Sequence, residues 1–290
     1  MRKIGEFSRI IAGTMTWGPW GKNFSTPETV EMIWHCVENG LSSFDLADIY
    51  GSYTNEMDFG KALAQSGVER DKIQLTSKCG IQLTKGRDNA INHYQYDREY
   101  ITQSAESALR KLHTDYLDQY LLHRPSPLLD PEEVASAVIP LLESGKIRRF
   151  GVSNFSPSQI AMLETMLPVS GNQIEFSLTR LEPMYDGNLD DMIAHKRFAM
   201  AWSPLGTFHR EGGPRTKRIQ KAMGPLMEKY GANESQLLLA WILRHPAQVH
   251  PVIGTTDRER IRLSAQAAKI ELELQDWFVL LKASQGQDVP

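Results

Sequence analysis

The stretch AGTMTWG, residues 12–18, follows the first apolar run of the chain and decides between two α/β folds. In a doubly wound nucleotide-binding sheet, the loop after the first strand carries the pattern G-x-G-x-x-G. That pattern is absent here. A parallel α/β barrel has no such requirement, and barrels of about 250 residues or more form one domain. The 290 residues of this chain therefore fit a barrel better.

The segments on either side repeat one rhythm, in which short apolar runs alternate with longer amphipathic segments. Such alternation is typical of β/α units. Strands are predicted over residues 10–13, 42–46, 73–77, 117–122, 149–152, 171–174, 198–202 and 249–253. No linker or low-complexity segment interrupts the series. The sequence therefore predicts an α/β fold, a (β/α)8 TIM barrel, as a single domain over residues 1–290.

Capping residues and glycines mark the predicted helix boundaries. A cap side chain accepts an orphan backbone N–H, and a proline in the first turn needs no donor, so a cap followed by proline predicts a start. Glycine adopts positive φ without strain and predicts an end. The starts fall at Thr26, Asp130 and Ser156, and the ends at Gly40, Gly145 and Gly231.

The composition describes an ordinary globular protein, with 41% hydrophobic and 23% charged residues and a net charge of -3. It gives no reason to expect nucleic-acid or membrane partners, because no basic tract is present. No apolar run approaches the roughly 18 residues of a transmembrane helix, and the first ten residues lack a signal-peptide pattern. We expect a cytoplasmic protein with a small-molecule substrate, no metal, and Cys36 and Cys79 in the reduced state.

Chemically active side chains stand at the predicted carboxyl ends of neighbouring strands. Asp45 ends the second strand, and Tyr50 follows it in FDLADIYG (44–51). Lys78 lies in LTSKCG (75–80) and His123 in LLHRP (121–125). Each residue alone is more often a cap, a solvated charge or a structural group. Barrel active sites lie on this face, however, so the convergence indicates a catalytic site. Asp48 is expected to be a structural turn residue.

Six motifs in this order, FDLADIYG, LTSKCG, LLHRP, GVSNF, AWSPLG and VIGTTDRERI, resemble those of the aldo-keto reductases. The resemblance extends from Gly13 to about Ala268, and is strongest to the bacterial oxidoreductases of the predicted aldo/keto reductase type. It implies NADP-dependent reduction of aldehydes or ketones to alcohols. The catalytic residues it implies are Tyr50, Asp45, Lys78 and His123.

Carbonyl reduction suits these four side chains. Negative charge develops on the carbonyl oxygen as hydride arrives, and Tyr50 is predicted to neutralise it with a proton. Lys78 should favour the phenolate and so lower the phenol pKa from its usual value of about 10, while Asp45 pairs with the buried ammonium. His123, as a neutral imidazole, would donate a hydrogen bond to the substrate oxygen.

The resemblance also implies a nicotinamide cofactor, NADPH in preference to NADH. Ser153, Asn154 and Gln173 would hold its carboxamide, and Trp202 would stack on the ring. Arg260 would meet the 2′-phosphate. The implied cofactor set is Gly13, Thr14, Met15, Asp45, Ser153, Asn154, Gln173, Trp202, Ser203, Pro204, Leu205, Gly206, Gly254, Thr255, Thr256, Arg260 and Ser264.

The helix that follows the eighth strand is expected to begin near Thr256. Its free N–H groups could attract phosphate. Thr256 with Glu259 also spells an ordinary capping box, so the local sequence alone leaves both interpretations open.

Substrate specificity depends on the loops around the predicted active site. Trp17, Trp20 and Tyr94 are candidates for the substrate pocket or for packing. The segment 81–98 is long enough to form a lid. The basic segment 205–225 is expected to be a loop that could clasp the pyrophosphate or be a solvated face.

Three other functions compete with the reductase. A regulatory protein could bind the nicotinamide and report redox state. A Schiff-base aldolase could use Lys78 as nucleophile, but this leaves Asn154, Gln173 and Trp202 without a role. A metal-dependent hydrolase is disfavoured because the first strand lacks paired histidines.

Overall fold

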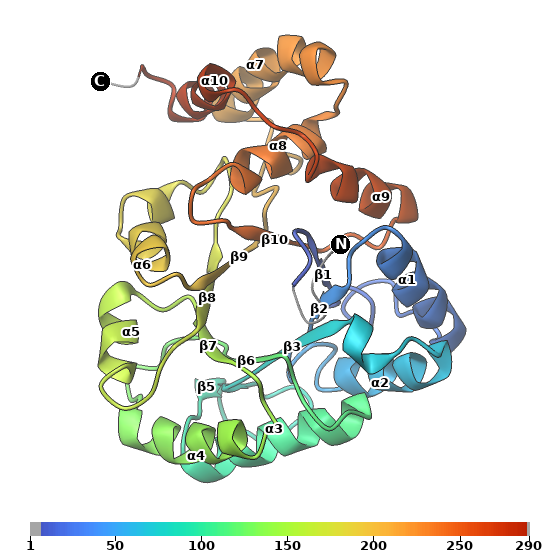
Figure 1. Ribbon diagram of the computed structural model, residues 1–290, viewed down its shortest axis with the longest axis vertical. Helices are drawn as coiled ribbons and strands as arrows, with labels where there is room; N and C mark the ends of the chain where they lie inside the picture. The colour runs from blue at the N-terminus through green and yellow to red at the C-terminus, as the bar shows by residue number, and fades with distance from the viewer. Residues whose placement is uncertain (1–6, 289–290) are drawn as a thin grey trace.

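Eight parallel strands close into a barrel in the computed structural model, which describes residues 7–288 (Figure 1). They are β1 (Ile11–Gly13), β2 (Ser43–Asp45), β3 (Gln74–Cys79), β6 (Gln119–Leu122), β7 (Phe150–Ser153), β8 (Gly171–Glu175), β9 (Phe198–Trp202) and β10 (His250–Ile253). Around the barrel the order is β1-β10-β9-β8-β7-β6-β3-β2. The eight predicted strands and the barrel are confirmed, with boundaries that move by a residue or two.

Helices surround the barrel (Figure 1); those before β10 connect successive strands, and two more of the described helices follow β10. They are α1 (Thr26–Glu38), α2 (Asn55–Ser66), α3 (Arg98–Leu112), α4 (Pro131–Glu143), α5 (Pro157–Leu163), α6 (Asn188–Ala194), α7 (Pro214–Tyr230), α8 (Glu234–Leu243), α9 (Arg258–Ala267) and α10 (Leu274–Gln285), with 3-10 turns η1 (Arg70–Lys72) and η2 (Glu182–Met184). A hairpin of β4 (Ile81–Gln82) and β5 (His93–Tyr94) stands between β3 and α3. No helix in residues 7–288 is long and apolar enough to cross a membrane.

The helix caps largely match the sequence signals. Asp130 and Ser156 cap α4 and α5 as predicted. The prediction of Thr26 as a cap was wrong by one residue. Ser25 is the N-cap, because its N–H donates to Glu28 Oε2 at 2.8 Å in a capping box, and Thr26 is the first helical residue.

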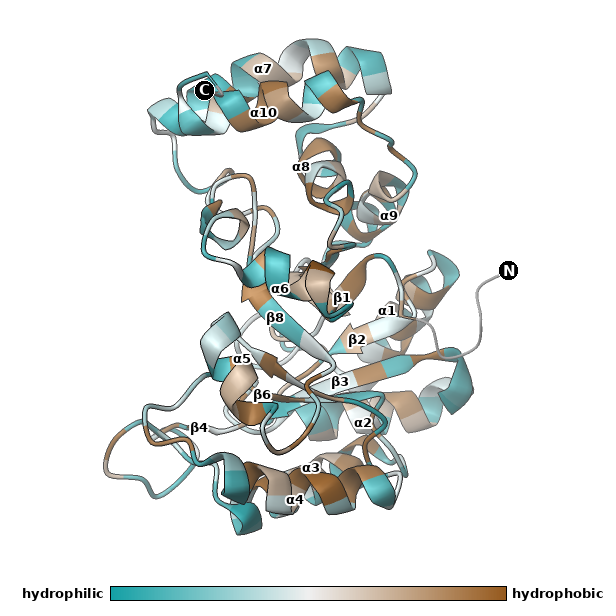
Figure 2. Ribbon diagram, turned by 60° about the vertical axis from the view of Figure 1, so that its left-hand side comes forward, coloured by the Kyte–Doolittle hydropathy of each residue, from teal (hydrophilic) through white to brown (hydrophobic). Residues whose placement is uncertain are grey.

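The helical layer is double on one side of the barrel, where α7 and α10 pack on each other outside α8 (Figure 1). Figure 2 shows α8 as a mainly hydrophobic helix between this pair and the strands, as expected of a helix that is apolar all round. The rings of Trp241 on α8 and Trp277 on α10 stack with centroids 4.9 Å apart, and each indole N–H donates to the other's backbone carbonyl. These contacts tie the outer layer to the barrel.

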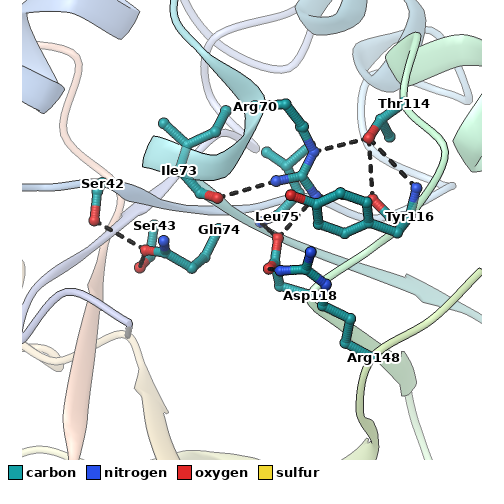
Figure 3. Close-up of polar contacts among 10 residues, drawn as sticks. All are labelled: Ser42, Ser43, Arg70, Ile73, Gln74, Leu75, Thr114, Tyr116, Asp118 and Arg148. Carbon is teal, nitrogen blue, oxygen red and sulfur yellow. Dashed lines mark hydrogen bonds and ion pairs between the residues drawn. The ribbon is translucent and has the colours of Figure 1, made fainter. Parts of the chain in front are cut away.

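A buried carboxylate joins β3 and β6 on the amino side of the barrel (Figure 3). Asp118 accepts hydrogen bonds from Arg70 at 2.8 Å, from Arg148 at 3.2 Å and from the backbone N–H of Leu75 at 2.9 Å. The guanidinium groups of the two arginines also cover the ring of Tyr116, at 3.9 and 3.6 Å from its centroid. This cluster stabilises the end of the barrel that faces away from the candidate active site.

Candidate active site

The side chains of Asp45, Tyr50 and Lys78 meet at the carboxyl ends of β2 and β3. Lys78 Nζ lies 2.7 Å from Asp45 Oδ2, 3.2 Å from Tyr50 Oη and 2.8 Å from the carbonyl oxygen of Leu46. Asp45, Tyr50 and Lys78 are all buried. Three acceptors match the three hydrogens of an ammonium group, so the lysine is held in one position.

The charges and the burial of this site together favour a protonated lysine and a protonated tyrosine. Burial lowers the pKa of Lys78, but Asp45 and Tyr50 outweigh it, and the net direction is upward. Burial raises the pKa of Tyr50 above 10, and Lys78 opposes this rise without cancelling it. Lys78 thus lowers the pKa of Tyr50, as expected, but the net shift is upward because desolvation of the phenolate, together with the Asp45 charge, outweighs the cation.

His123 follows β6 and faces the tyrosine, with ring centroids 5.9 Å apart and planes at 76°. Burial, and then the charges of Lys78 and Arg124, place its pKa well below 6.5, so the imidazole is neutral. Nδ1 is buried and has no hydrogen-bond partner among the described residues. A bare lone pair costs less to bury unpaired than an N–H. We therefore assign the proton to Nε2, where it can be donated to a ligand.

A chain of hydrogen bonds links Asp45 to the far side of the barrel mouth. Gln173 Nε2 donates to Asp45 Oδ1 at 2.8 Å, and Ser153 Oγ donates to the Gln173 carbonyl at 2.9 Å. Asn154 Nδ2 donates to Ser153 Oγ at 2.8 Å, and Trp202 Nε1 donates to Asn154 Oδ1 at 2.8 Å. Amide and hydroxyl groups beside an indole ring are a donor set that fits a carboxamide on an aromatic ring.

Not all of the first-loop residues point towards a ligand. Gly13 pairs in register with Asp45. Thr14 is fully buried, and its hydroxyl contacts the Asp45 carbonyl at 3.1 Å and Asn55 Oδ1 at 2.9 Å. Thr14 thus secures the strand end that carries the Asp45 carboxylate, while Met15 is exposed beside it.

The three aromatic candidates for the substrate pocket separate in the structure. Trp17 is only 3% exposed and packs against Phe44 in the core, so we leave it out of the proposed pocket. Trp20 is 38% exposed, with its ring centroid 6.2 Å from that of Tyr50, and can form a wall of the mouth. Tyr94 is exposed on the β4–β5 hairpin.

The segment after β9 forms a tight turn at Ser203-Pro204-Leu205-Gly206. Ser203 and Gly206 have φ of 48° and 54°. A Cβ at Gly206 would lie 1.9 Å from Thr179 Oγ1, so only glycine fits. The expectation of a loop through residue 225 was wrong, because α7 begins at Pro214.

Two arginines of this basic segment have structural partners. Arg215 donates to the Thr179 carbonyl at 2.9 Å, and Arg218 donates to the Ala283 carbonyl at 2.9 Å. These bonds weaken the interpretation of the segment as a pyrophosphate clasp.

The helix after β10 begins later than expected. Asp257, not Thr256, is the N-cap, and its Oδ1 accepts from the Arg260 N–H at 2.9 Å. The Asp257 side chain thus caps α9 three residues before Arg260, and the capping box of Thr256 and Glu259 does not form. Thr255 Oγ1 accepts from the Asp257 N–H at 3.2 Å, Gly254 is exposed and open, and Ser264 Oγ donates to the Arg260 carbonyl at 2.7 Å.

Arg260 lies near the start of α9, and its charge is not paired with any of the described carboxylates. Glu259 pairs with Arg262, and Arg258 pairs with Glu31. The Arg260 side chain is exposed and forms no ion pair with the residues described by the structure. Both acidic residues near it are thus engaged, one as the cap and one with Arg262.

The surroundings of two residues, Asp48 and Arg124, go beyond what the sequence predicted. Asp48 is structural, as expected, and its side chain is buried. Its carboxylate accepts from Tyr100 Oη at 2.9 Å and from the Ile49 N–H at 2.7 Å. Arg124 is absent from the predicted site residues, although its position directly after His123 at a strand end is a signal for it.

A parallel barrel that brings a lysine-bound tyrosine and a neutral histidine together at its carboxyl face has the architecture of an aldo-keto reductase. The sequence model of the Aldo/keto reductase family matches residues 9–282. The chain belongs to this family.

Individual relatives align over nearly the full chain. The uncharacterized oxidoreductase YcsN of Bacillus subtilis (strain 168) is 42% identical over 98% of this chain and 97% of its own length. Oxidoreductase YdhF of Escherichia coli (strain K12) is 39% identical over 98% and 96%. Among solved structures, an aldo-keto reductase from Klebsiella pneumoniae in complex with NADPH is 27% identical, with a TM-score of 0.79, over 99% of this chain and 94% of that chain.

Proposed function

We propose that this protein reduces aldehydes or ketones to alcohols with NADPH, and that Tyr50 is the proton donor. One observation carries the proposal: Tyr50 Oη lies 3.2 Å from a buried lysine ammonium that Asp45 holds at 2.7 Å. A phenol in this position is protonated yet has a cation ready to stabilise its anion. These are the properties that a general acid needs.

Each side chain has a separate role in the proposed reaction. A bound nicotinamide would supply the hydride, which no side chain can provide. His123 Nε2–H donates a hydrogen bond to the substrate carbonyl and orients its oxygen towards Tyr50. Tyr50 passes its proton to that oxygen as negative charge develops there. Lys78 then stabilises the phenolate, and Asp45 keeps the lysine in place.

The cofactor assignment rests on the fit of the chain and on the relative bound to NADPH. Ser153, Asn154 and Gln173 would hold the carboxamide, and Trp202 would support the ring. Arg260 would meet the 2′-phosphate, since its planar fork can form two charge-assisted hydrogen bonds.

The structure argues against the aldolase alternative. A Schiff-base lysine must expose a neutral amine to its substrate. Lys78 is fully buried, its hydrogens are taken by three acceptors, and its pKa is raised by Asp45 and Tyr50 against the effect of burial. Borohydride trapping of substrate on Lys78 is therefore expected to fail.

A screen of simple aldehydes and ketones, followed by NADPH absorbance, tests the proposed function. We expect steady turnover of at least some aldehydes. A protein that binds NADPH but turns over none of them would instead match the regulatory alternative.

A further inference from the structure

We propose that Arg124 selects carbonyl substrates that carry an anionic group, a carboxylate or a phosphate, and so defines the substrate class. This inference rests on the proposed function and extends it, because the same barrel mouth is involved.

The side chains of Arg124 and Trp202 approach each other over the mouth of the barrel. Arg124 follows the end of β6, yet its guanidinium carbon lies 5.2 Å from the ring centroid of Trp202 at the end of β9. In the barrel, β7 and β8 stand between these two strands. The guanidinium therefore lies over the opening rather than along the outer surface.

The backbone of Arg124 is fixed by a buried tyrosine. Tyr96 Oη donates to the Arg124 carbonyl at 2.5 Å and accepts from the Arg124 N–H at 3.1 Å. A hydroxyl that both donates to and accepts from one residue holds its position, so the side chain starts from a defined place beside His123.

No acidic side chain compensates the Arg124 charge in the described part of the chain. Its guanidinium forms no ion pair or hydrogen bond there, in contrast to Arg70 or Arg197, which each contact a carboxylate. The charge nevertheless reaches the reacting groups. After burial and Lys78, Arg124 is the next cause that lowers the pKa of His123.

An uncompensated guanidinium at this position discriminates between substrates by charge. Its planar donors match the oxygens of a carboxylate or phosphate. Its position at the opening lets its charge attract an anion that approaches the site. A neutral aldehyde gains nothing from it. An aldehyde with an anionic group a few bonds from the carbonyl can place its oxygen at Tyr50 and its charge at Arg124.

The test compares two matched pairs of substrates: succinic semialdehyde with its methyl ester, and glyceraldehyde phosphate with glyceraldehyde. We expect the wild type to prefer at least one anionic member by about 10-fold in kcat/KM, from hydrogen bonds to a charged group. Arg124→Met should bring that ratio close to one, and Arg124→Lys should retain part of it. Arg110→Met removes the same charge from the exposed end of α3 and should leave the ratio intact.

The pair that shows the preference identifies the anionic group as carboxylate or phosphate. No preference in the wild type for either pair would overturn the proposal, as would a preference that survives Arg124→Met. Tighter NADPH binding by Arg124→Met with an unchanged ratio would show that Arg124 merely competes with the nicotinamide for the Trp202 ring.

A binding measurement separates failure of this inference from failure of the proposed function. Calorimetric titration with butyrate and with butyramide needs no turnover. We expect butyrate to bind the wild type about 10-fold more tightly, and this difference to vanish in Arg124→Met. If no aldehyde is reduced, the proposed function fails while this titration still decides on Arg124. Equal binding of butyrate and butyramide by the wild type contradicts the inference even in an active reductase.

Discussion

Removal of Lys78 should destabilise the protein as well as inactivate it. In Lys78→Met, the buried Asp45 carboxylate loses its cation at 2.7 Å but keeps the Gln173 amide at 2.8 Å. Breaking a buried pair typically costs about 3–5 kcal/mol, and the remaining hydrogen bond places this case near 3 kcal/mol. Asp45→Asn leaves the ammonium without its carboxylate and should cost about the same. If the two residues acted independently, the double variant would lose about 6 kcal/mol.

Because each single variant leaves one unpaired charge and the double variant leaves none, we expect the double variant to lose only about 1–2 kcal/mol. Urea unfolding followed by circular dichroism gives the four free energies. All three variants should be inactive. Additive losses in the double variant would show that Lys78 and Asp45 do not stabilise each other and would refute the pairing.

Three further predictions follow from other parts of the structure. Arg260→Ala should reduce the NADPH over NADH preference in kcat/KM by about 10-fold, whereas Arg262→Ala on the same helix should not; equal loss for both cofactors would contradict the role of Arg260. Asp118→Ala should cost about 3 kcal/mol in urea unfolding and leave kcat unchanged, since Asp118 lies on the opposite face; an unchanged urea midpoint would contradict its stabilising role. Burial, and then Glu56, raise the pKa of Asp48 from 3.8 to about 7, so the stability contributed by its protonated form is present below pH 3.8 and lost as the pH rises through about 7. Asp48→Asn should therefore gain stability relative to wild type from pH 4 to pH 8, and a constant difference in urea midpoints would argue against this shift.

The barrel could be predicted because its signals are local and repeated. Each apolar run, each cap such as Asp130 or Ser156 and each terminal glycine specifies its own unit, and eight such units leave few architectures. The errors lie where neighbouring residues compete for one role. Ser25 rather than Thr26 caps α1, because only Ser25 stands three residues before Glu28.

The site was harder to predict where the answer depends on which way a side chain points. The strand ends place Asp45, Lys78 and His123 on one rim, but the sequence cannot show that Trp17 turns into the core while Trp20 faces Tyr50. The same limit applies to electrostatics, because the balance between burial and a neighbouring cation needs coordinates. The approach of Arg124 to Trp202 is likewise invisible in the sequence, because β7 and β8 stand between their strands and the directions of both side chains decide it.

The role of Tyr50 as proton donor is tested most directly by the single-turnover rate of NADPH oxidation in Tyr50→Phe. This change removes the hydroxyl and leaves the ring, Trp20 and the cofactor residues in place. We predict that the rate with a good aldehyde falls by at least roughly 100-fold, the usual scale of general acid catalysis, while the Kd for NADPH stays the same. A variant that reduces the aldehyde at a near-normal rate would contradict the assignment of Tyr50 as the acid.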